Sequence, residues 1–481
     1  DWVNDGVPYV LDGDLSVWEG DGGKNGDAHA PVLKIYPGVT VKFPKDKTLT
    51  IGHDDGNHRG RLDAKGVTFT VTDTTDNARW YGIDIRAGAV NDSTVLDSSV
   101  IEYAVRGIEI WGNRAPTITR NTIRYNSGDG IRLISGGAVK ITGNTIMNNT
   151  GYGIYSEITY HNSRVTGNTF LENKYPVAVR TQDLDSTFYN NTYTNNTNNY
   201  IRVTSDRIEN QSRTYDWVND GVPYVLDGDL SVWEGDGGKN GDAHAPVLKI
   251  YPGVTVKFPK DKTLTIGHDD GNHRGRLDAK GVTFTVTDTT DNARWYGIDI
   301  RAGAVNDSTV LDSSVIEYAD QGLAIYGNKA PTITRNTFRY NSNYGIYSHD
   351  HEFALRITGN TFLENKYPVA VRTHDLDSTL YGNTYINNTN NYIQVTSDRI
   401  ETQSRTFDWV NDGVPYVLDG DLSVWEGDGG KNGDAHAPVL KIYPGVTVKF
   451  PKDKTLTIGH DDGNHRGRLD AKGVTFTVTD T

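Results

Sequence analysis

Two glycine-rich acidic segments contain side chains that could bind a metal ion. One spans residues 19–27 and the other spans residues 53–58. Hard oxygen ligands at alternating positions with intervening glycine are what Ca²⁺ requires. Neither segment matches the twelve-residue loop that identifies a calcium site, and a solvated polar loop has the same composition. We therefore predict at most weak Ca²⁺ binding by these segments. The candidate ligands are Asp21, Asp27, Asp54 and Asp55, and their copies in the repeated sequence are Asp236, Asp242, Asp269 and Asp270.

Another group of polar residues could carry out acid–base chemistry. Asp84, Glu109 and Arg132 occupy the outward position of successive G-I-x-φ segments, where φ is apolar. Carboxylates on one face could act as general acid and base in polysaccharide cleavage. A second copy of the region keeps Asp299 but has Ala324 in place of Glu109, so the cluster is not repeated. We therefore favour a solvated face of mixed charge and assign no catalytic residue.

A histidine-rich group occurs in the second copy of the region. Residues 349–352 read His-Asp-His-Glu, and donors at alternate positions could hold one metal ion. A polar loop between strands explains the same residues, so no metal site is assigned there.

The composition excludes several classes of function. The 481 residues include no cysteine, which excludes disulfides and thiolate metal sites. The formal net charge of −14 works against nucleic acid and anionic lipid, and no apolar run has the length of a transmembrane helix. We predict neither a nucleic-acid partner nor membrane insertion. Residue 1 is Asp and no signal-like segment follows it, so we expect a processed or excerpted piece.

The chain repeats itself on a long scale. Residues 1–104 recur unchanged as residues 216–319, and residues 1–74 recur again as residues 408–481. Further along, the sequence of Thr169–Arg180 reappears at Thr361, which is an offset of 192 residues. We predict three tandem domains: module 1 at 1–215, module 2 at 216–407 and a partial module 3 at 408–481. Module 2 is shorter than module 1 by one of the short repeats described next.

A shorter repeat of about 23 residues lies inside each module. In module 1 it is marked by two series of positions, Gly107, Gly130, Gly153 and Pro176, and Asn121, Asn144, Asn168 and Asn191. Because the module lengths differ by one such repeat, the units must be equivalent and stacked, which predicts a solenoid.

The short repeats read as β-strands. Apolar and polar residues alternate in β-branched runs bounded by Gly and Asn, and no stretch has a helical period. We predict an all-β parallel β-helix with two inward columns, Ile108, Ile131, Ile154 and Val177, and Ile118, Ile141 and Val165. The Asn series should lie at a corner, where stacked amides can hydrogen-bond along the axis and Asn tolerates a left-handed backbone.

The order of motifs in each module adds a resemblance to a known family. The runs PYVLDGDLSV, LKIYPGVTVKF, LTIG, GRLDAKGVTFT and WYGIDI, followed by NTI-type repeats, resemble the parallel β-helix repeat proteins of bacterial and archaeal cell surfaces. These proteins belong to the pectate-lyase-like superfamily. The resemblance implies a right-handed parallel β-helix, and that fold hosts lyases, hydrolases, adhesins and inert scaffolds.

The tandem array favours a structural function. Copying a whole module lengthens a rod, whereas a catalyst gains little from a second site. We expect an extracellular, cell-surface structural protein forming a rod, filament, sheath or surface layer, with no enzymatic activity. The alternatives are a polysaccharide-cleaving enzyme of pectate-lyase type and a glycan-binding adhesin that uses exposed aromatic residues such as Trp80, Tyr81, Tyr103 and Trp111.

The expected partners follow from the array. Open strand edges at residue 481 would recruit further copies end to end or laterally, unless that residue marks only the edge of an excerpt. Cell-surface glycans are a second possible partner, and no cofactor other than Ca²⁺ is expected. Sequons for N-glycosylation occur at Asn91, Asn148, Asn190, Asn195, Asn210, Asn306 and Asn387.

Overall fold

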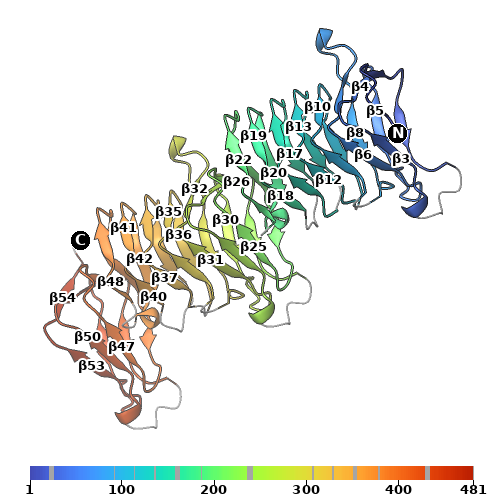
Figure 1. The fold of residues 1–481 in the computed structure, drawn as a ribbon. Helices are drawn as coiled ribbons and strands as arrows, with labels where there is room; N and C mark the ends of the chain where they lie inside the picture. The colour runs from blue at the N-terminus through green and yellow to red at the C-terminus, as the bar shows by residue number, and fades with distance from the viewer. Residues whose placement is uncertain are drawn as a thin grey trace. The chain divides into compact units, whose positions relative to one another are not determined.

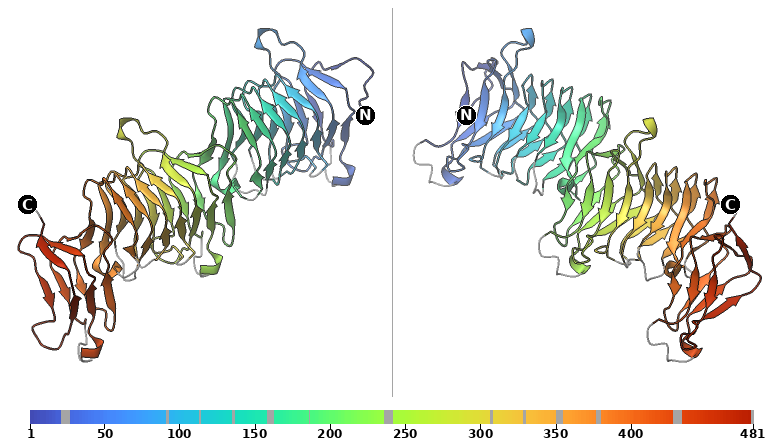
Figure 2. Two further views of the ribbon diagram at one scale, coloured as in Figure 1. Left: turned by 60° about the vertical axis from the view of Figure 1, so that its left-hand side comes forward. Right: turned by 180° about the vertical axis from the view of Figure 1, so that it is seen from behind.

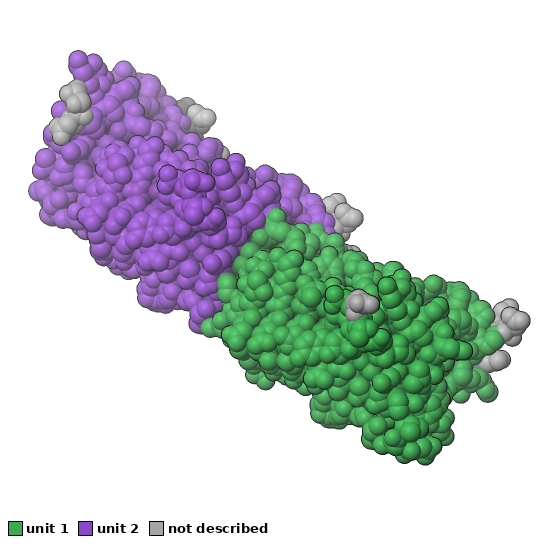
Figure 3. Space-filling view, turned by 90° about the horizontal axis from the view of Figure 1, so that it is seen from above, with its two compact units in different colours: residues 1–206, 215–227 green, residues 207–214, 228–481 purple. Residues whose placement is uncertain are grey.

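The computed structural model describes residues 1–20, 27–90, 93–112, 114–134, 137–157, 163–185, 187–235, 242–305, 308–327, 330–349, 355–376, 380–427 and 434–479. The chain divides into two compact units (Figure 3). Unit 1 comprises residues 1–206 and 215–227, and unit 2 comprises residues 207–214 and 228–481.

Unit 1 is a parallel β-helix whose coils each contribute three short strands (Figure 1). The first strands of its coils pair in the order β1 (Tyr9–Val10), β4 (Thr40–Phe43), β7 (Thr68–Val71), β10 (Val100–Glu102), β13 (Thr122–Arg124), β16 (Thr145–Met147), β19 (Thr169–Leu171) and β22 (Thr192–Thr194). The second strands are β2 (Leu15–Val17), β5 (Thr48–Ile51), β8 (Gly82–Ile85), β11 (Ile108–Ile110), β14 (Ile131–Leu133), β17 (Tyr152–Ser156), β20 (Tyr175–Arg180), β23 (Ile201–Thr204) and β26 (Tyr224–Leu226). The third strands are β3 (Val32–Ile35), β6 (Arg61–Lys65), β9 (Val95–Asp97), β12 (Thr117–Thr119), β15 (Lys140–Thr142), β18 (Arg164–Thr166) and β21 (Phe188–Tyr189).

Unit 2 repeats this arrangement, as the views of Figure 2 show. Its longest sheet is β24 (Arg207–Ile208), β27 (Leu230–Val232), β30 (Thr263–Ile266), β33 (Gly297–Ile300), β36 (Gln321–Ile325), β39 (Tyr344–Ser348), β42 (Tyr367–Arg372), β45 (Ile393–Thr396), β48 (Tyr416–Leu418), β51 (Thr447–Phe450) and β54 (Thr475–Val478). Beside it run β29 (Thr255–Phe258), β32 (Thr283–Val286), β35 (Val315–Glu317), β38 (Thr337–Arg339), β41 (Thr361–Leu363) and β44 (Thr384–Ile386), and β28 (Val247–Ile250), β31 (Arg276–Lys280), β34 (Val310–Asp312), β37 (Thr332–Thr334), β40 (Arg356–Thr358) and β43 (Leu380–Tyr381).

Shorter elements complete the chain. Two three-stranded sheets combine strands from the end of module 2 with strands of module 3: β46 (Arg399–Ile400), β49 (Leu422–Val424) and β52 (Leu456–Ile458), and β47 (Thr406–Trp409), β50 (Val439–Ile442) and β53 (Arg468–Ala471). Strand β25 (Thr214–Trp217) contains residues of both units. Single 3₁₀ turns lie at η1 (Asp27–His29), η2 (Thr75–Asn77), η3 (Thr181–Asp183), η4 (Asp242–His244), η5 (Thr290–Asn292), η6 (Thr373–Asp375) and η7 (Asp434–His436).

The inward columns confirm the predicted register. Ile108 pairs with Ile131, Ile131 with Ile154 and Ile154 with Val177, so adjacent rungs lie 23 residues apart. All four side chains are buried. Because alternate side chains of a strand point to opposite faces, this register places one apolar residue per coil in a continuous core. The parallel β-helix with coils of about 23 residues is confirmed.

The corner Asn residues stack as predicted but do not adopt the left-handed backbone. The buried Oδ1 of Asn144 accepts hydrogen bonds from the backbone N–H and the Nδ2 of Asn121, at 2.9 and 3.0 Å. The residue before each of these Asn side chains has the positive φ instead, as in Arg120 (54°) and Gly143 (67°). That part of the prediction was wrong. The preceding residue makes the turn, which leaves the Asn side chain directed inward to the next coil.

A second buried Asn series runs five residues after the first. Its members in module 1 are Asn126, Asn149, Asn173 and Asn196, and each Oδ1 of the last three accepts hydrogen bonds from the Asn before it. The same spacing of 23 to 24 residues could have predicted it from sequence.

The order of strands changes at the module boundary within unit 2. In the sheet β42–β45–β48–β51–β54, the second strands of module 2 are followed by the first strands of module 3. Unit 1 shows the same change, since β20 and β23 are followed by β26, the copy of β1. The first strands of each new module therefore extend the sheet that is formed by the second strands of the module before it.

Candidate functional site

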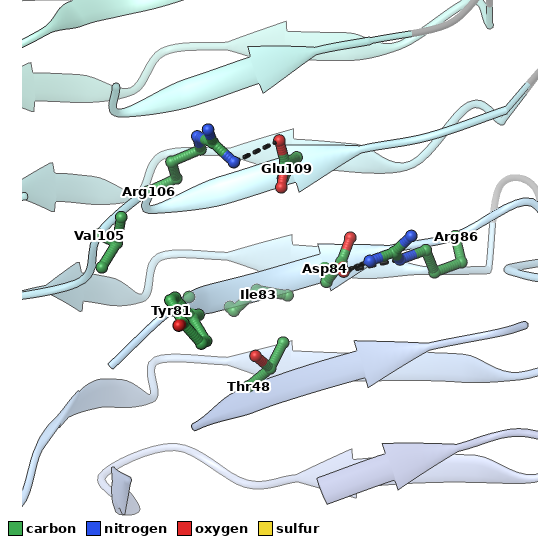
Figure 4. A pocket seen from close by; sticks show the side chains of 9 residues that line it. Thr48, Tyr81, Ile83, Asp84, Arg86, Val105, Arg106 and Glu109 are labelled. Atoms are coloured by element: carbon green, nitrogen blue, oxygen red, sulfur yellow. Dashed lines mark hydrogen bonds and ion pairs between the residues drawn. The ribbon is translucent and has the colours of Figure 1, made fainter. Parts of the chain in front are cut away.

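A small polar cavity lies on the outer face of the second-strand sheet of unit 1. Strands β5, β8 and β11 form its floor, and its volume is about 170 Å³. Figure 4 shows Asp84 and Glu109 on neighbouring strands, each with an arginine beside it. The two carboxylates are register partners, as the sequence predicted, because they occupy the same outward position of successive coils.

Asp84 has the most unusual environment of these residues. The side chain is buried, its Oδ2 accepts a hydrogen bond from Arg86 Nε at 2.6 Å, and its Oδ1 has no hydrogen-bond partner among the described residues. Burial raises the pKa of Asp84 to about 6, although the Arg86 guanidinium opposes the change; the negative charge of Glu109 adds to it. Asp84 is therefore a carboxyl group that can hold or release a proton near neutral pH.

Glu109 is neutralised by arginines on either side. Arg106 Nη1 lies 3.0 Å from Glu109 Oε1, and Arg132 Nε lies 3.9 Å from the same oxygen. Arg132 also forms an ion pair with Glu157. An acid with a raised pKa beside a carboxylate and several guanidinium groups could bind an anionic sugar and donate a proton to it. The sequence did not identify Arg86 and Arg106, because both lie outside the G-I-x-φ positions.

The corresponding place in module 2 keeps only half of this arrangement. Asp299 still pairs with Arg301, and burial raises the pKa of Asp299. Glu109 is replaced by Ala324, a register partner of Asp299, and Arg106 is replaced by Gln321.

The predicted calcium ligands Asp54 and Asp55 do not act together. Asp54 Oδ1 lies 2.9 Å from Arg86 Nη1, whereas Asp55 Oδ2 lies 2.6 Å from His58 Nδ1. Asp269 and Asp270 repeat this division, with Asp269 paired to Arg301 and Asp270 to His273. An ion bound at Asp55 or Asp270 would therefore lie beside an imidazole nitrogen.

The other predicted ligands are only partly placed. Asp21 and Asp236 lie outside the described residues, as do residues 350–352 of the His-Asp-His-Glu group. The backbone of Asp27 belongs to η1, and Asp242 Oδ1 lies 3.5 Å from Arg274 Nε. His349 is exposed and lies against the ring of Tyr326, with centroids 5.6 Å apart.

The aromatic residues suggested for glycan binding are not all exposed. Trp80 is fully buried, stacks on Phe43 with ring centroids 4.6 Å apart, and donates from Nε1 to the Glu102 carbonyl. The expectation that it is exposed was wrong: Trp80 precedes β8, forms an isolated bridge with Ala104, and its indole fills the core. Tyr81 is 52% exposed at the edge of the cavity, and Trp111 lies under Arg86.

Comparison with protein families identifies the fold. The profile of the right-handed β-helix region matches residues 61–214 and 266–404. No curated protein matches the sequence. Within the described residues, none of the helical segments has the length and apolar character needed to cross a membrane.

Proposed function

The chain belongs to the right-handed β-helix family, and from the way its modules join we propose that it is an extracellular structural protein. Its tandem modules stack into a rigid element of a rod, filament, sheath or surface layer, and it binds further copies of itself. The family fold hosts enzymes and non-enzymes alike, so the proposal depends on the module boundary and not on the fold.

The supporting observation is the boundary within unit 2, which has no linker. Strands β42, β45, β48 and β51 form one parallel ladder in unbroken register from module 2 into module 3. The first residues of module 3 are part of the core: Trp409 is fully buried and stacks on Tyr416, with ring centroids 5.2 Å apart. An aromatic ring of this size buries about 150–250 Å². At about 25 cal/mol per Å² the burial of each ring stabilises the folded chain by at most roughly 4–6 kcal/mol, and Tyr416 is the register partner of Ile393 in module 2.

Electron microscopy of the native material tests this proposal. A structural protein of this kind should appear as ordered polymers or lattices, and protease treatment of intact cells should release it from the surface. A native protein that is monomeric at high concentration, and protected from protease in intact cells, would contradict the proposal.

The cavity around Asp84 favours a second candidate function, binding or cleavage of an acidic polysaccharide by module 1. The observation behind it is a buried carboxyl with a pKa of about 6 and one unpaired oxygen, next to the carboxylate of Glu109. Arg86, Arg106 and Arg132 would provide the positive charge that an anionic sugar requires.

Module 2 supplies the matched variant for that candidate. The double substitution Arg106→Gln and Glu109→Ala converts the cavity to residues that the same fold already accepts in module 2. Binding to or release of products from a panel of acidic polysaccharides should be lost in this variant while thermal stability is kept. Equal activity in both proteins, or none in either, would remove the candidate.

A further inference from the structure

The opening of each module places two imidazoles around one carboxylate. In module 2, His268 Nδ1 lies 3.3 Å from Asp270 Oδ1, and His273 Nδ1 lies 2.6 Å from Asp270 Oδ2. One donor atom from each residue lies within 4.8 Å of the other two. The described chain holds three such clusters, and the other two are His53, Asp55 and His58, and His460, Asp462 and His465.

The loop that carries the cluster is fixed by its backbone. The His268 N–H donates to the His273 carbonyl at 3.2 Å, and the Gly303 N–H donates to the His268 carbonyl at 2.8 Å. The N–H groups of Asn272 and His273 donate to Asp270 Oδ1 at 2.9 and 3.2 Å, which fixes the carboxylate in the loop. The three donors are therefore held near one another.

A buried carboxylate without a partner lies next to this loop. Glu234 is fully buried, and neither of its carboxylate oxygens has a hydrogen-bond partner among the described residues. Its backbone N–H donates to the carbonyl of Arg274, the residue after His273, at 2.9 Å. Burial raises the pKa of Glu234, and the positive charges of Arg274, His244 and His273 oppose that change.

The same unpaired carboxylate accompanies the cluster of module 3. Glu426 is fully buried, and both of its oxygens lack a partner among the described residues. Its backbone N–H bonds to the Arg466 carbonyl, next to His465. A buried carboxylate that lacks a hydrogen bond is costly, and a bound cation nearby would compensate for it.

We propose that each module opening binds one divalent transition-metal ion of the Zn²⁺ type, held in module 2 by imidazole nitrogens of His268 and His273 and a carboxylate oxygen of Asp270. Glu234 supplies a second negative charge beside the ion. Two nitrogen donors and one oxygen donor suit Zn²⁺ and its neighbours in the first transition row, whereas Ca²⁺ takes oxygen ligands. Three protein ligands leave a position for water or for a donor from another molecule.

The site shares Asp270 with the calcium site expected from the acidic residues alone, but its other donors are imidazoles. Asp269 belonged to that expectation, but its carboxylate is paired with Arg301 at 3.2 Å and is not among the three clustered donors. Asp269 and Asp270 are adjacent, carry the same charge and differ in their partners. They therefore provide a matched pair of positions for the test.

Metal content of the full chain after dialysis against Zn²⁺ tests the proposal, with calorimetry for affinity and Co²⁺ absorption for the ligand set. We expect three ions per chain, one for each cluster of the described residues. Asp270→Asn and His273→Ala should each lower the content to two, while Asp269→Asn should leave it at three. Glu234→Gln should weaken one site by about 10–100-fold, as loss of a neighbouring charge does in other metal sites.

Circular dichroism and melting temperature verify that each variant is folded, and the unaltered sites of modules 1 and 3 act as internal references. Three ions retained in Asp270→Asn would overturn the proposal, as would one lost in Asp269→Asn. Binding of Ca²⁺ as tight as that of Zn²⁺, or no Zn²⁺ retained at all, would also overturn it.

Discussion

Asp412 closes the corner Asn series of module 2 by accepting two hydrogen bonds from Asn383. The Asn383 N–H donates to Asp412 Oδ1 at 3.0 Å, and Asn383 Nδ2 donates to Asp412 Oδ2 at 2.9 Å. Asp412 is the fifth residue of module 3, so one module satisfies the last buried amide of its predecessor. In unit 1 the corresponding residue, Asp220, accepts from the N–H groups of Asn190 and Asn191.

Asp412→Ala should lower the free energy of unfolding by roughly 2–4 kcal/mol, because two buried donors of Asn383 and the Tyr385 hydroxyl lose their acceptor. Asp412→Asn is the matched variant, since an Asn at interior positions of the series accepts both bonds through one Oδ1. Chemical denaturation should show the Ala variant to be much less stable than the Asn variant. Equal loss in both would mean that the carboxylate charge, and not the hydrogen bonding, is what matters.

Asn144→Ala tests the interior of the same kind of series. Asn144 accepts from Asn121 and donates to the Ile118 carbonyl and to Asn168, all in buried surroundings. The substitution leaves several buried groups unpaired and should cost roughly 3–5 kcal/mol. Asn148→Gly serves as control.

Asn148 lies in the same coil as Asn144, and its side-chain amide donates to Glu172 near the surface, so Asn148→Gly removes only that exposed hydrogen bond. Asn148 has a φ of 53°, which glycine adopts freely, so this variant should lose less than about 1 kcal/mol. Thermal melts of the two variants side by side should differ by several degrees. A difference near zero would show that the inward amides do not stabilise the stack.

The stability of the protein should depend on the protonation of Asp84. Its folded-state pKa of about 6 lies above the value of about 4 for an unfolded aspartate. The folded protein thus holds this proton more tightly, so the free energy of unfolding falls as the pH rises from about 4 to about 6 and is level above that. The difference between the two pKa values corresponds to roughly 3 kcal/mol at most.

Asp84→Asn should remove this dependence. Denaturation curves recorded from pH 4 to pH 8 should show that the variant gains stability relative to the wild-type protein as the pH rises. A constant difference between the two proteins across that range would mean that the pKa of Asp84 is the same in the folded and unfolded states, and would also weaken the candidate acid–base function.

The repeating core could be predicted from the sequence because its period is exact. A spacing of 23 residues from Ile108 to Ile131 and Ile154 leaves one register that buries all of them, and the structure has it. The stacking of Asn144 on Asn121 followed from the same period. The second Asn series carries the same signal and could have been found in the same way.

Other features depend on contacts that a spacing does not reveal. The pKa of Asp84 depends on its burial and on Arg86, and Trp80 is buried in the core where it stacks on Phe43. The pairing of Asp55 with His58 and of Asp54 with Arg86 depends on which way each side chain of the loop turns. The change of sheet at β48 has no local signature, because residues 408–481 are identical to residues 1–74.

Distances between pairs of spin labels measure directly whether modules 2 and 3 form one rigid stack. The chain has no cysteine, so spin labels can be attached at Thr384→Cys in module 2 and Lys452→Cys in module 3, both exposed in unit 2. A second pair, Arg356→Cys with Thr384→Cys, lies within module 2 and gives the width expected for a rigid body. We predict that electron–electron double resonance gives a single distance across the boundary with the same narrow width as the reference pair. A broad distribution across the boundary beside a narrow one within module 2 would contradict the continuous ladder.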